Sequence, residues 1–360
     1  MEISKNNMKM LKGVAILFML LLHLFCRKDV NGLYETLVSF NGIPLAYYIG
    51  LFGDACVPIY CFASGYGLYI SYHKHTFLKK NSIRILKLLI NFWIILLLFM
   101  LIGFLAGKSG AFQGGLGSFL LNFFVLSNSY NGAWWFLQTY IILILLTPYI
   151  VKKVKAHSTR NVLVVSVVIY LISYIQRIKE IIDLDQAFYT SLINSLVLVG
   201  TSLFPFIVGC IFAKEKVNSK ISRKFSANPY RNLISGCAIF GLLVLHSVYE
   251  SMIVAPLTAI AFVCLFNLMS KGKTVKKVLL FFGDHSTNIW LTHMFFYMSI
   301  FPELTFAPRY WILVFIWLIA LCLLSSYLIN FIFYPIGKMV DRMIMKKSIE
   351  SNLKEGKLIG

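Results

Sequence analysis

The chain has 360 residues, of which 59% are hydrophobic and 13% are charged, and its mean hydropathy is +0.77. A soluble domain is about 45–50% apolar and about 25% charged. This composition excludes an ordinary soluble protein and indicates an integral membrane protein, although the formal charge is +20.

Apolar segments recur along the whole chain, each of about the length needed to cross 30 Å of hydrocarbon. We predict an all-α fold, a polytopic membrane helix bundle of about ten transmembrane helices. The predicted spans are 8–26, 43–72, 83–106, 133–151, 161–176, 189–213, 232–248, 252–270, 278–300 and 310–334. They form one predicted transmembrane domain, 1–345, followed by a short cytoplasmic tail, 346–360.

The basic residues predict the orientation of this bundle. With the N-terminus in the cytoplasm, all but six of the 34 Lys and Arg residues fall on the cytoplasmic side. The six exceptions are Arg27, Lys28, Lys108, Arg177, Lys179 and Arg309. This is the positive-inside bias, and it places both termini in the cytoplasm. The charge therefore serves topology and anionic lipids, with some available for an anionic cytoplasmic ligand, and no nucleic-acid partner is expected.

The first span contains two ionisable residues, Lys12 and His23. Such groups cost a few kcal/mol inside a bilayer, so they normally face a partner or a water-filled cavity. A helix places them about 16 Å apart on nearly the same face. We predict a groove with Lys12 at its cytoplasmic mouth and His23 in its outer half. Alternatively, Lys12 only snorkels toward the headgroups and His23 bonds to a neighbouring helix.

The second span contains a carboxylate and a group of small residues. Asp54, between Gly53 and Pro58, should lie in the outer half or middle of the membrane, where it could orient an imidazole, bind a cation or mark a re-entrant bend. Ser64 and Gly65, in "CFASGYGLY", would admit a slim cofactor tail or simply pack against another helix.

Two further motifs border the third and fourth spans. The segment "HKHTFLKKNSIRILK" contains Lys80 and Arg84 in a basic cluster that suits phosphate groups, although such clusters often serve topology alone. Trp134 and Trp135 begin the fourth span at its outer end. They form either part of an aromatic belt or a platform for a sugar.

The ninth span carries the second important histidine. His293 ends the run "GDHSTNIWLTH", which also contains Asn288, and it should reach the depth of His23. Two imidazoles in one cavity could perform acid–base chemistry; alternatively, His293 only braces helix packing. His246 is predicted to form an interfacial pair with Glu250. The sequence has no phosphate-binding loop and no zinc motif, so no metal is expected.

These segments, taken in order, resemble the acyltransferase 3 family of bacterial membrane enzymes. The family's first span has Arg-Gly and then a His eleven residues after the Arg, and Lys12-Gly13 and His23 fit this pattern with a Lys in place of the Arg. "FASGY" resembles its Phe-x-x-Ser-Gly-Phe/Tyr pattern with an offset. Its Arg-x-x-Arg element keeps only Arg84, with Asn81 at the other position. "WWFLQTYI" and "HSTNIWLTH" resemble its two remaining motifs.

The resemblance implies an acyl-CoA-dependent O-acetyltransferase in the bacterial cytoplasmic membrane. It would move an acetyl group from acetyl-CoA to a hydroxyl of an extracytoplasmic or lipid-linked glycan, such as a capsule or exopolysaccharide. The predicted site comprises His23, His293 and Asp54 as catalytic residues with His23 as general base, Lys12, Ser64, Gly65, Lys80 and Arg84 for the acyl-CoA, and Trp134, Trp135 and Asn288 for the acceptor. The alternatives are a transporter or flippase for a lipid-linked sugar and a non-catalytic scaffold. The acceptor sugar, the acyl chain length and the oligomeric state stay open.

Overall fold

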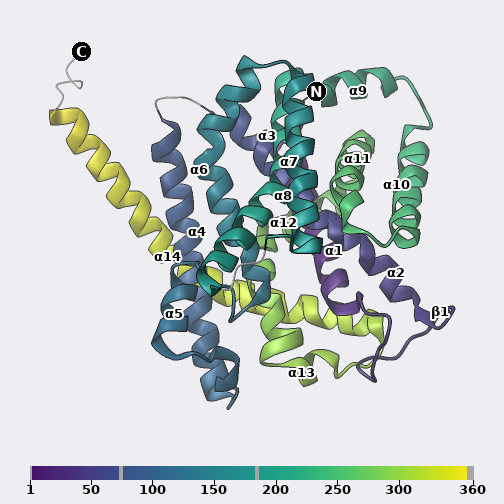
Figure 1. Ribbon diagram of the computed structural model, residues 1–360, viewed down its shortest axis with the longest axis vertical. Helices are drawn as coiled ribbons and strands as arrows, with labels where there is room; N and C mark the ends of the chain where they lie inside the picture. Colours follow the sequence, from purple (N-terminus) through teal and green to yellow (C-terminus); the bar gives the residue numbers. More distant parts are fainter. Residues whose placement is uncertain (1, 73–75, 183–185, 355–360) are drawn as a thin grey trace.

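The computed structural model describes residues 2–72, 76–182 and 186–354, and it is almost entirely helical (Figure 1). The α-helices are α1 (Lys5–Phe25), α2 (Leu45–Leu51), α3 (Cys56–Ile70), α4 (Phe77–Leu105), α5 (Gly115–Phe123), α6 (Trp135–Ala156), α7 (Thr159–Lys179), α8 (Ala187–Glu215), α9 (Val217–Phe225), α10 (Arg231–Val248), α11 (Ala255–Leu268), α12 (Lys273–Met294), α13 (Pro302–Phe306) and α14 (Trp311–Lys354).

Short 3-10 and π-helical turns connect or extend several of these helices. They are η1 (Phe52–Ala55), η2 (Ser109–Phe112), η3 (Gly132–Trp134), η4 (Met252–Val254) and the π-turn η5 (Phe295–Ser299). Two residues each form the antiparallel strands β1 (Ser39–Phe40) and β2 (Ile43–Pro44), in the connection after α1. The prediction of an all-α fold is confirmed.

Each predicted span falls on mainly helical residues. Eight of the described helical segments are long and apolar enough to cross a membrane, namely α1, α2 to α3, α4, η3 to α6, α7, α8, α10 and α14. The predicted span 252–270 corresponds to the shorter apolar helix Met252–Leu268. The predicted span 278–300 is α12 with η5, whose middle is less apolar because it contains Asp284, His285 and Asn288.

Helix α1 lies at the centre of the bundle, where it packs against α12, α2 and α3. Helices α1 and α12 approach closely because each contributes a glycine to the contact. A Cβ atom at Gly13 would collide with the backbone of Leu279, and one at Gly283 would collide with the backbone of Lys9. Only glycine permits this approach. The contact fixes the register of the two helices, and it sets His23 beside His293 further along.

The second predicted span is not one continuous helix. Helix α2 ends at Leu51, the 3-10 turn η1 follows, and α3 begins at Cys56. Pro58 at the third position of α3 is compatible with a helix start, because the first helical residues need no N–H partner within the helix. The tighter turn places Asp54 at a break between two helices. Membrane helices are often interrupted in this way where they carry a functional group.

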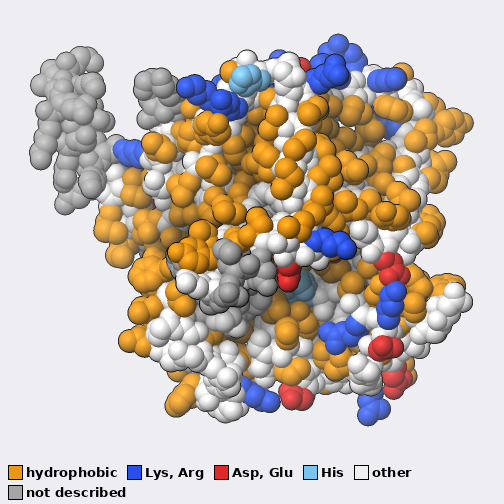
Figure 2. All heavy atoms as spheres, in the orientation of Figure 1, with side chains coloured by type: hydrophobic (Ala, Val, Ile, Leu, Met, Phe, Trp, Pro, Cys, Tyr) orange, Lys and Arg blue, Asp and Glu red, His pale blue; other side chains and the backbone are white. Residues whose placement is uncertain are grey.

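The two ends of the described chain lie at the same end of the molecule (Figure 1). Figure 2 shows Lys and Arg gathered at that end, an orange hydrophobic band below them, and a hollow in the lower half where a histidine is visible. The protein is therefore a multi-pass membrane protein in which many of the basic residues gather at one end of the bundle (Figure 2).

The predicted boundary at residue 345 falls inside a helix. Helix α14 continues to Lys354, and it changes direction part-way along (Figure 1). Pro335 lies inside it and removes one backbone hydrogen bond, which is the usual cause of such a bend. Residues 355–360 of the predicted tail lie outside the described residues.

Candidate active site

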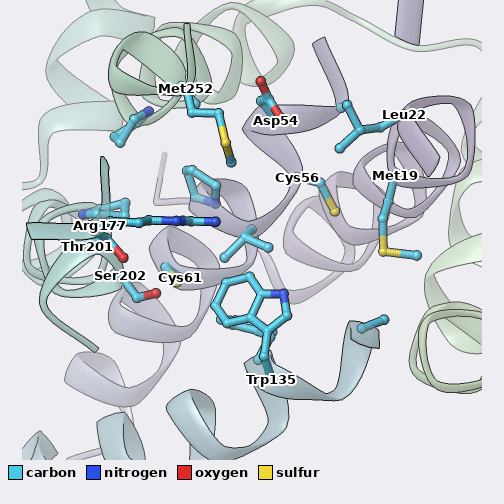
Figure 3. Close-up of a pocket in the computed structure, with 18 of the residues that line it drawn as sticks. Met19, Leu22, Asp54, Cys56, Cys61, Trp135, Arg177, Thr201, Ser202 and Met252 are labelled. Carbon is cyan, nitrogen blue, oxygen red and sulfur yellow. The ribbon is translucent and has the colours of Figure 1, made fainter. Parts of the chain in front are cut away.

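A cavity of about 220 Å³ lies between α1, α3, α7, α8 and the starts of α6 and α11. Polar and aromatic side chains from distant parts of the chain line it, including His23, Asp54, Trp135, Arg177, Ser202 and Trp290. Figure 3 shows Asp54 on one side, Trp135 on the opposite side, and Arg177 reaching in between them. Two of the three predicted catalytic residues therefore border one cavity.

His23 occupies the wall of this cavity near the outer end of α1, and its side chain is half-buried. Its Nδ1 lies 3.4 Å from the hydroxyl of Tyr297. Its ring centre lies 4.9 Å from that of His293. The sequence predicts the two histidines at the same depth in the membrane. Because α1 and α12 pack side by side, their rings are also in contact.

His293 lies directly behind His23 and is fully buried. Its Nδ1 lies 2.7 Å from the carbonyl oxygen of Trp290, so Nδ1 carries the hydrogen that it donates. In the neutral ring, Nε2 then holds the lone pair. Among the described residues this Nε2 has no hydrogen-bond partner. A buried nitrogen without a partner is costly, which makes it a sign of function.

Asp54 lines the cavity with a side chain that is 11% exposed. One of its oxygens lies 3.5 Å from Nε2 of His246, which is fully buried in α10. The predicted pairing of His246 with Glu250 is therefore wrong. Glu250 lies beyond the end of α10, where it binds Lys28 at 2.8 Å and Tyr47 at 2.9 Å. His246 and Glu250 are therefore apart, because His246 points into the bundle from α10 and Glu250 follows the end of that helix.

Eleven residues before His23 on α1, Lys12 lies among groups from three other helices. Its ammonium group is 6.0 Å from the centre of the Tyr60 ring, and the Tyr60 hydroxyl donates to its backbone carbonyl at 3.3 Å. Arg84 on α4 is within electrostatic range of Lys12 and of Tyr140. The Tyr140 hydroxyl also interacts with Ser64. Three residues predicted to hold the acyl-CoA, Lys12, Arg84 and Ser64, therefore lie near one another.

A family model described as an acyltransferase domain matches residues 5–333, which is nearly the whole chain. The chain belongs to the acyltransferase 3 family. No curated protein and no solved structure matches it. Its activity as a membrane acyltransferase is thus supported by the family.

Lys80 and Gly65 differ in their position relative to the group formed by Lys12, Arg84 and Ser64. Lys80 is exposed and lies one turn before Arg84, on the same face of α4. Gly65 instead faces α8, where a Cβ atom would collide with the backbone of Phe206 and where its carbonyl accepts from the Cys210 thiol. Close helix packing accounts for this glycine, as the alternative interpretation of the sequence held.

The two tryptophans of the acyltransferase have different surroundings. Trp135 lines the cavity (Figure 3). Trp134 is buried behind it, where its indole N–H donates to the carbonyl of Leu291 and its ring packs against Phe92 and Phe295. Neighbouring residues at the start of a helix face different sides, so only Trp135 is in a position to contact a ligand in the cavity.

Asn288 lies away from the cavity in a buried cluster between α4, α12 and α14. Its side-chain N–H groups donate to Ser326 and Asn330 at 3.0 Å, and its oxygen accepts from Asn91 at 2.8 Å. All of its polar atoms are therefore engaged in holding helices together, and the residue is not among those that line the cavity.

Sequence reasoning missed three residues of the site: Arg177, His246 as a partner of Asp54, and Tyr297. Tyr297 follows His293 by four residues, so helical spacing could have identified it. Arg177 was visible only as an exception to the positive-inside pattern. Among the described residues, no group of three or more His, Cys, Asp or Glu side chains is arranged to hold a metal.

Proposed function

We propose that this acyltransferase moves an acetyl group from cytoplasmic acetyl-CoA to a hydroxyl of an extracytoplasmic or lipid-linked glycan. The observation that carries the proposal is the histidine pair, in which His23 faces the cavity and His293 supports it from behind. In a family of acyltransferases, an imidazole on a cavity wall is the group best suited to remove a proton from a hydroxyl at neutral pH.

The acceptor binds in the cavity, with one face of its sugar ring against Trp135. His23 donates its Nδ1–H to the Tyr297 hydroxyl and presents the lone pair of Nε2 to the acceptor. That nitrogen takes the hydroxyl proton while the oxygen attacks the thioester carbon. The tetrahedral intermediate then expels the CoA thiolate, which takes the proton from His23. The products are the acetyl ester and CoA, and His23 returns to its starting state.

His293 and Asp54 stabilise the positive charge that forms on His23. His293 stays neutral because its Nδ1–H is committed to Trp290, and its free Nε2 lone pair lies beside the ring that gains the proton. Asp54 is within electrostatic range of His23. His246 acts as a positioning residue that holds the Asp54 carboxylate at the cavity. Negative charge and lone pairs placed in advance lower the barrier without reorganisation.

The donor approaches from the opposite side. Arg84, Lys80 and Lys12 offer positive charge to the phosphates of CoA, and the guanidinium fork of Arg84 suits bidentate contact. The pantetheine arm would run past Ser64 and the Tyr140 hydroxyl toward His23, a helical distance of about 16 Å from Lys12. This proposal requires a passage along α1 between the two groups.

The test is a transfer assay with the purified protein in nanodiscs, labelled acetyl-CoA, and glycans isolated from the surface of the source cells. Because general base catalysis contributes about 10²–10⁴-fold, we expect His23→Gln to lose at least about 100-fold in kcat. His157→Gln, the same change at an exposed histidine, is the matched control. Both variants must retain the native melting temperature.

Two results would contradict the proposal in different ways. Full activity of His23→Gln would remove this histidine from the mechanism. Label that stays on CoA with every glycan, while a lipid-linked sugar crosses the membrane, would favour a flippase. Comparison of surface glycans from deletion and parent strains by NMR would identify the lost O-acetyl group, and hence the acceptor.

A further inference from the structure

The cavity contains a cation that the mechanism above does not use. Arg177, two residues before the end of α7, lines the cavity, and Figure 3 shows its guanidinium group pointing into it. It is one of the six basic residues on the outer side, where the positive-inside pattern disfavours them. Its place in the cavity therefore calls for a reason other than topology.

Among the described residues, two of the other five basic residues predicted on the outer side form ion pairs, and Arg177 is the one of the remaining four that lines the cavity. Lys28 binds Glu250 and Lys108 binds Glu303, so these two cations have carboxylate partners. In the part of the chain that the structure describes, no carboxylate lies within 4.0 Å of the Arg177 guanidinium. Asp54, the carboxylate that lines the same cavity, lies 3.5 Å from Nε2 of His246. Arg177 thus faces the cavity with its five N–H donors available.

From this geometry we propose that the acceptor carries an anionic group, a carboxylate or a phosphate, which Arg177 binds. The guanidinium fork matches both groups in a bidentate manner. Trp135, on the opposite side of the cavity from Asp54 in Figure 3, offers an aromatic face to the sugar ring that bears the anion. Arg177 is exposed, so the strength of this charge pair comes from its bidentate geometry more than from exclusion of water.

The opposite charges in the cavity also orient the acceptor. Asp54 repels an anionic group, whereas Arg177 attracts it, so the anion lies at the Arg177 side of the cavity. The remaining hydroxyls of the ring then face His23 and Asp54. Arg177 in this way determines both the class of sugar and which hydroxyl reaches the base. This inference rests on the proposed function, because the sugar that it describes is the acceptor of the proposed acetyl transfer.

Equilibrium binding tests the inference without needing acetyl transfer. The probes are methyl glucoside, methyl glucuronide and methyl glucoside 6-phosphate, which share one ring and differ in charge. Their dissociation constants are measured by tryptophan fluorescence and calorimetry on the full-length protein in neutral phosphatidylcholine nanodiscs. The variants are Arg177→Gln, Arg177→Lys and, as a control of equal charge on the same helix end, Lys179→Gln.

We expect the native protein to bind one of the anionic sugars about 10–100-fold more tightly than the glucoside, the range of charge-assisted hydrogen bonds. Which one it prefers distinguishes a carboxylate from a phosphate. Arg177→Gln should remove most of this preference, Arg177→Lys should keep part of it, and Lys179→Gln should keep all of it.

Several outcomes would overturn the inference. They are equal binding of the three sugars by the native protein, no binding of either anionic sugar, and a preference that survives Arg177→Gln. If Arg177→Gln instead weakens only the binding of phosphatidylglycerol in anionic nanodiscs, the residue serves a lipid headgroup and the inference is wrong. A native preference for anionic sugars without any acetyl transfer would leave the inference intact and defeat the proposed function alone.

Discussion

Two buried polar groups on α12 differ in one decisive way. His293 lies beside a cavity with an unpartnered nitrogen, whereas Asn288, five residues earlier on the same helix, has all of its polar atoms bonded. Both are polar residues inside an apolar bundle, so both carry the cost of burial. The cluster around Asn288 recovers that cost through hydrogen bonds. Among the described residues, the Nε2 of His293 is instead left without a partner, beside the His23 ring that lines the cavity.

The closed cluster extends beyond Asn288. His285 contributes Nδ1 to the Ser326 hydroxyl at 2.8 Å, and Asn91 and Asn330 complete the group across α4, α12 and α14. Networks in which every member is satisfied stabilise one arrangement of helices. The comparison indicates that a polar residue inside a membrane span is a candidate for a functional role when its hydrogen bonding is incomplete and a cavity lies nearby.

The largest expected effect tests the two histidines of α12 against each other. Because His293 supports the ring that gains the proton, we expect His293→Gln to lose about 100-fold or more in kcat for acetyl transfer, with little change in melting temperature. His285→Gln should change kcat less than about threefold and lower the melting temperature, since it weakens the bond to Ser326. Kinetics and thermal unfolding of both variants check this. Equal losses of kcat in His293→Gln and His285→Gln would contradict the distinction between the site around His293 and the cluster around Asn288.

The next effect concerns Asp54. Removing its charge with Asp54→Asn should cost about 10–100-fold in kcat, or about 1.4–2.7 kcal/mol of transition-state stabilisation. His246→Gln should lose less, because it acts only through the position of the Asp54 carboxylate. The double variant should then be no worse than Asp54→Asn alone. Additive losses in this cycle would show that His246 acts independently, contrary to the role assigned to it.

A smaller effect, on stability alone, is expected in the closed cluster. Asn288→Leu leaves Asn91, Ser326 and Asn330 with unpaired groups. Interhelical hydrogen bonds in membrane proteins contribute about 0.6 kcal/mol each on average, so we expect a loss of about 1–2 kcal/mol in the free energy of unfolding. The kcat of the folded variant should stay within about threefold of the native value. Denaturant titration in detergent and transfer kinetics measure the two, and a large loss of kcat would return Asn288 to the site.

Much of the fold could be predicted because membrane insertion acts on short segments of sequence. Hydropathy located the spans, and the charges of the loops predicted their orientation. Depth along each span follows from counting residues, and this is why the contact of His23 with His293 could be predicted. Equal depth brings two residues together only if their helices are neighbours. The glycine contacts between α1 and α12 ensure this for the two histidines.

The lateral arrangement of helices could not be read from the sequence. To orient an imidazole was one of three roles considered for Asp54, and the position of α10 beside η1 places His246 next to its carboxylate. The two tryptophans of one helix start face different sides, and Gly65 packs against α8. Each of these outcomes depends on which helix lies next to which, a property of the whole bundle.

The smallest expected effect is at the outer surface, in the ion pair of Lys28 with Glu250. Hydrogen bonds from Lys28 and then Tyr47 lower the pKa of Glu250 below its ordinary value near 4.5. Its contribution to stability is therefore present above that value and is lost as the pH falls through the folded-state pKa. The pair is exposed to solvent and to salt, so Glu250→Gln should lower the melting temperature only slightly at pH 7.

At acid pH the native protein and Glu250→Gln should unfold at the same temperature, and transfer at pH 7 should be unchanged because Glu250 does not line the cavity. Thermal unfolding at a series of pH values, with Lys179→Gln as a control of surface charge, measures this. A difference that grows on acidification would contradict the lowered pKa. A loss of transfer would instead extend the functional region from the cavity to the outer rim, and the comparison between free and satisfied polar groups would then need to include surface ion pairs.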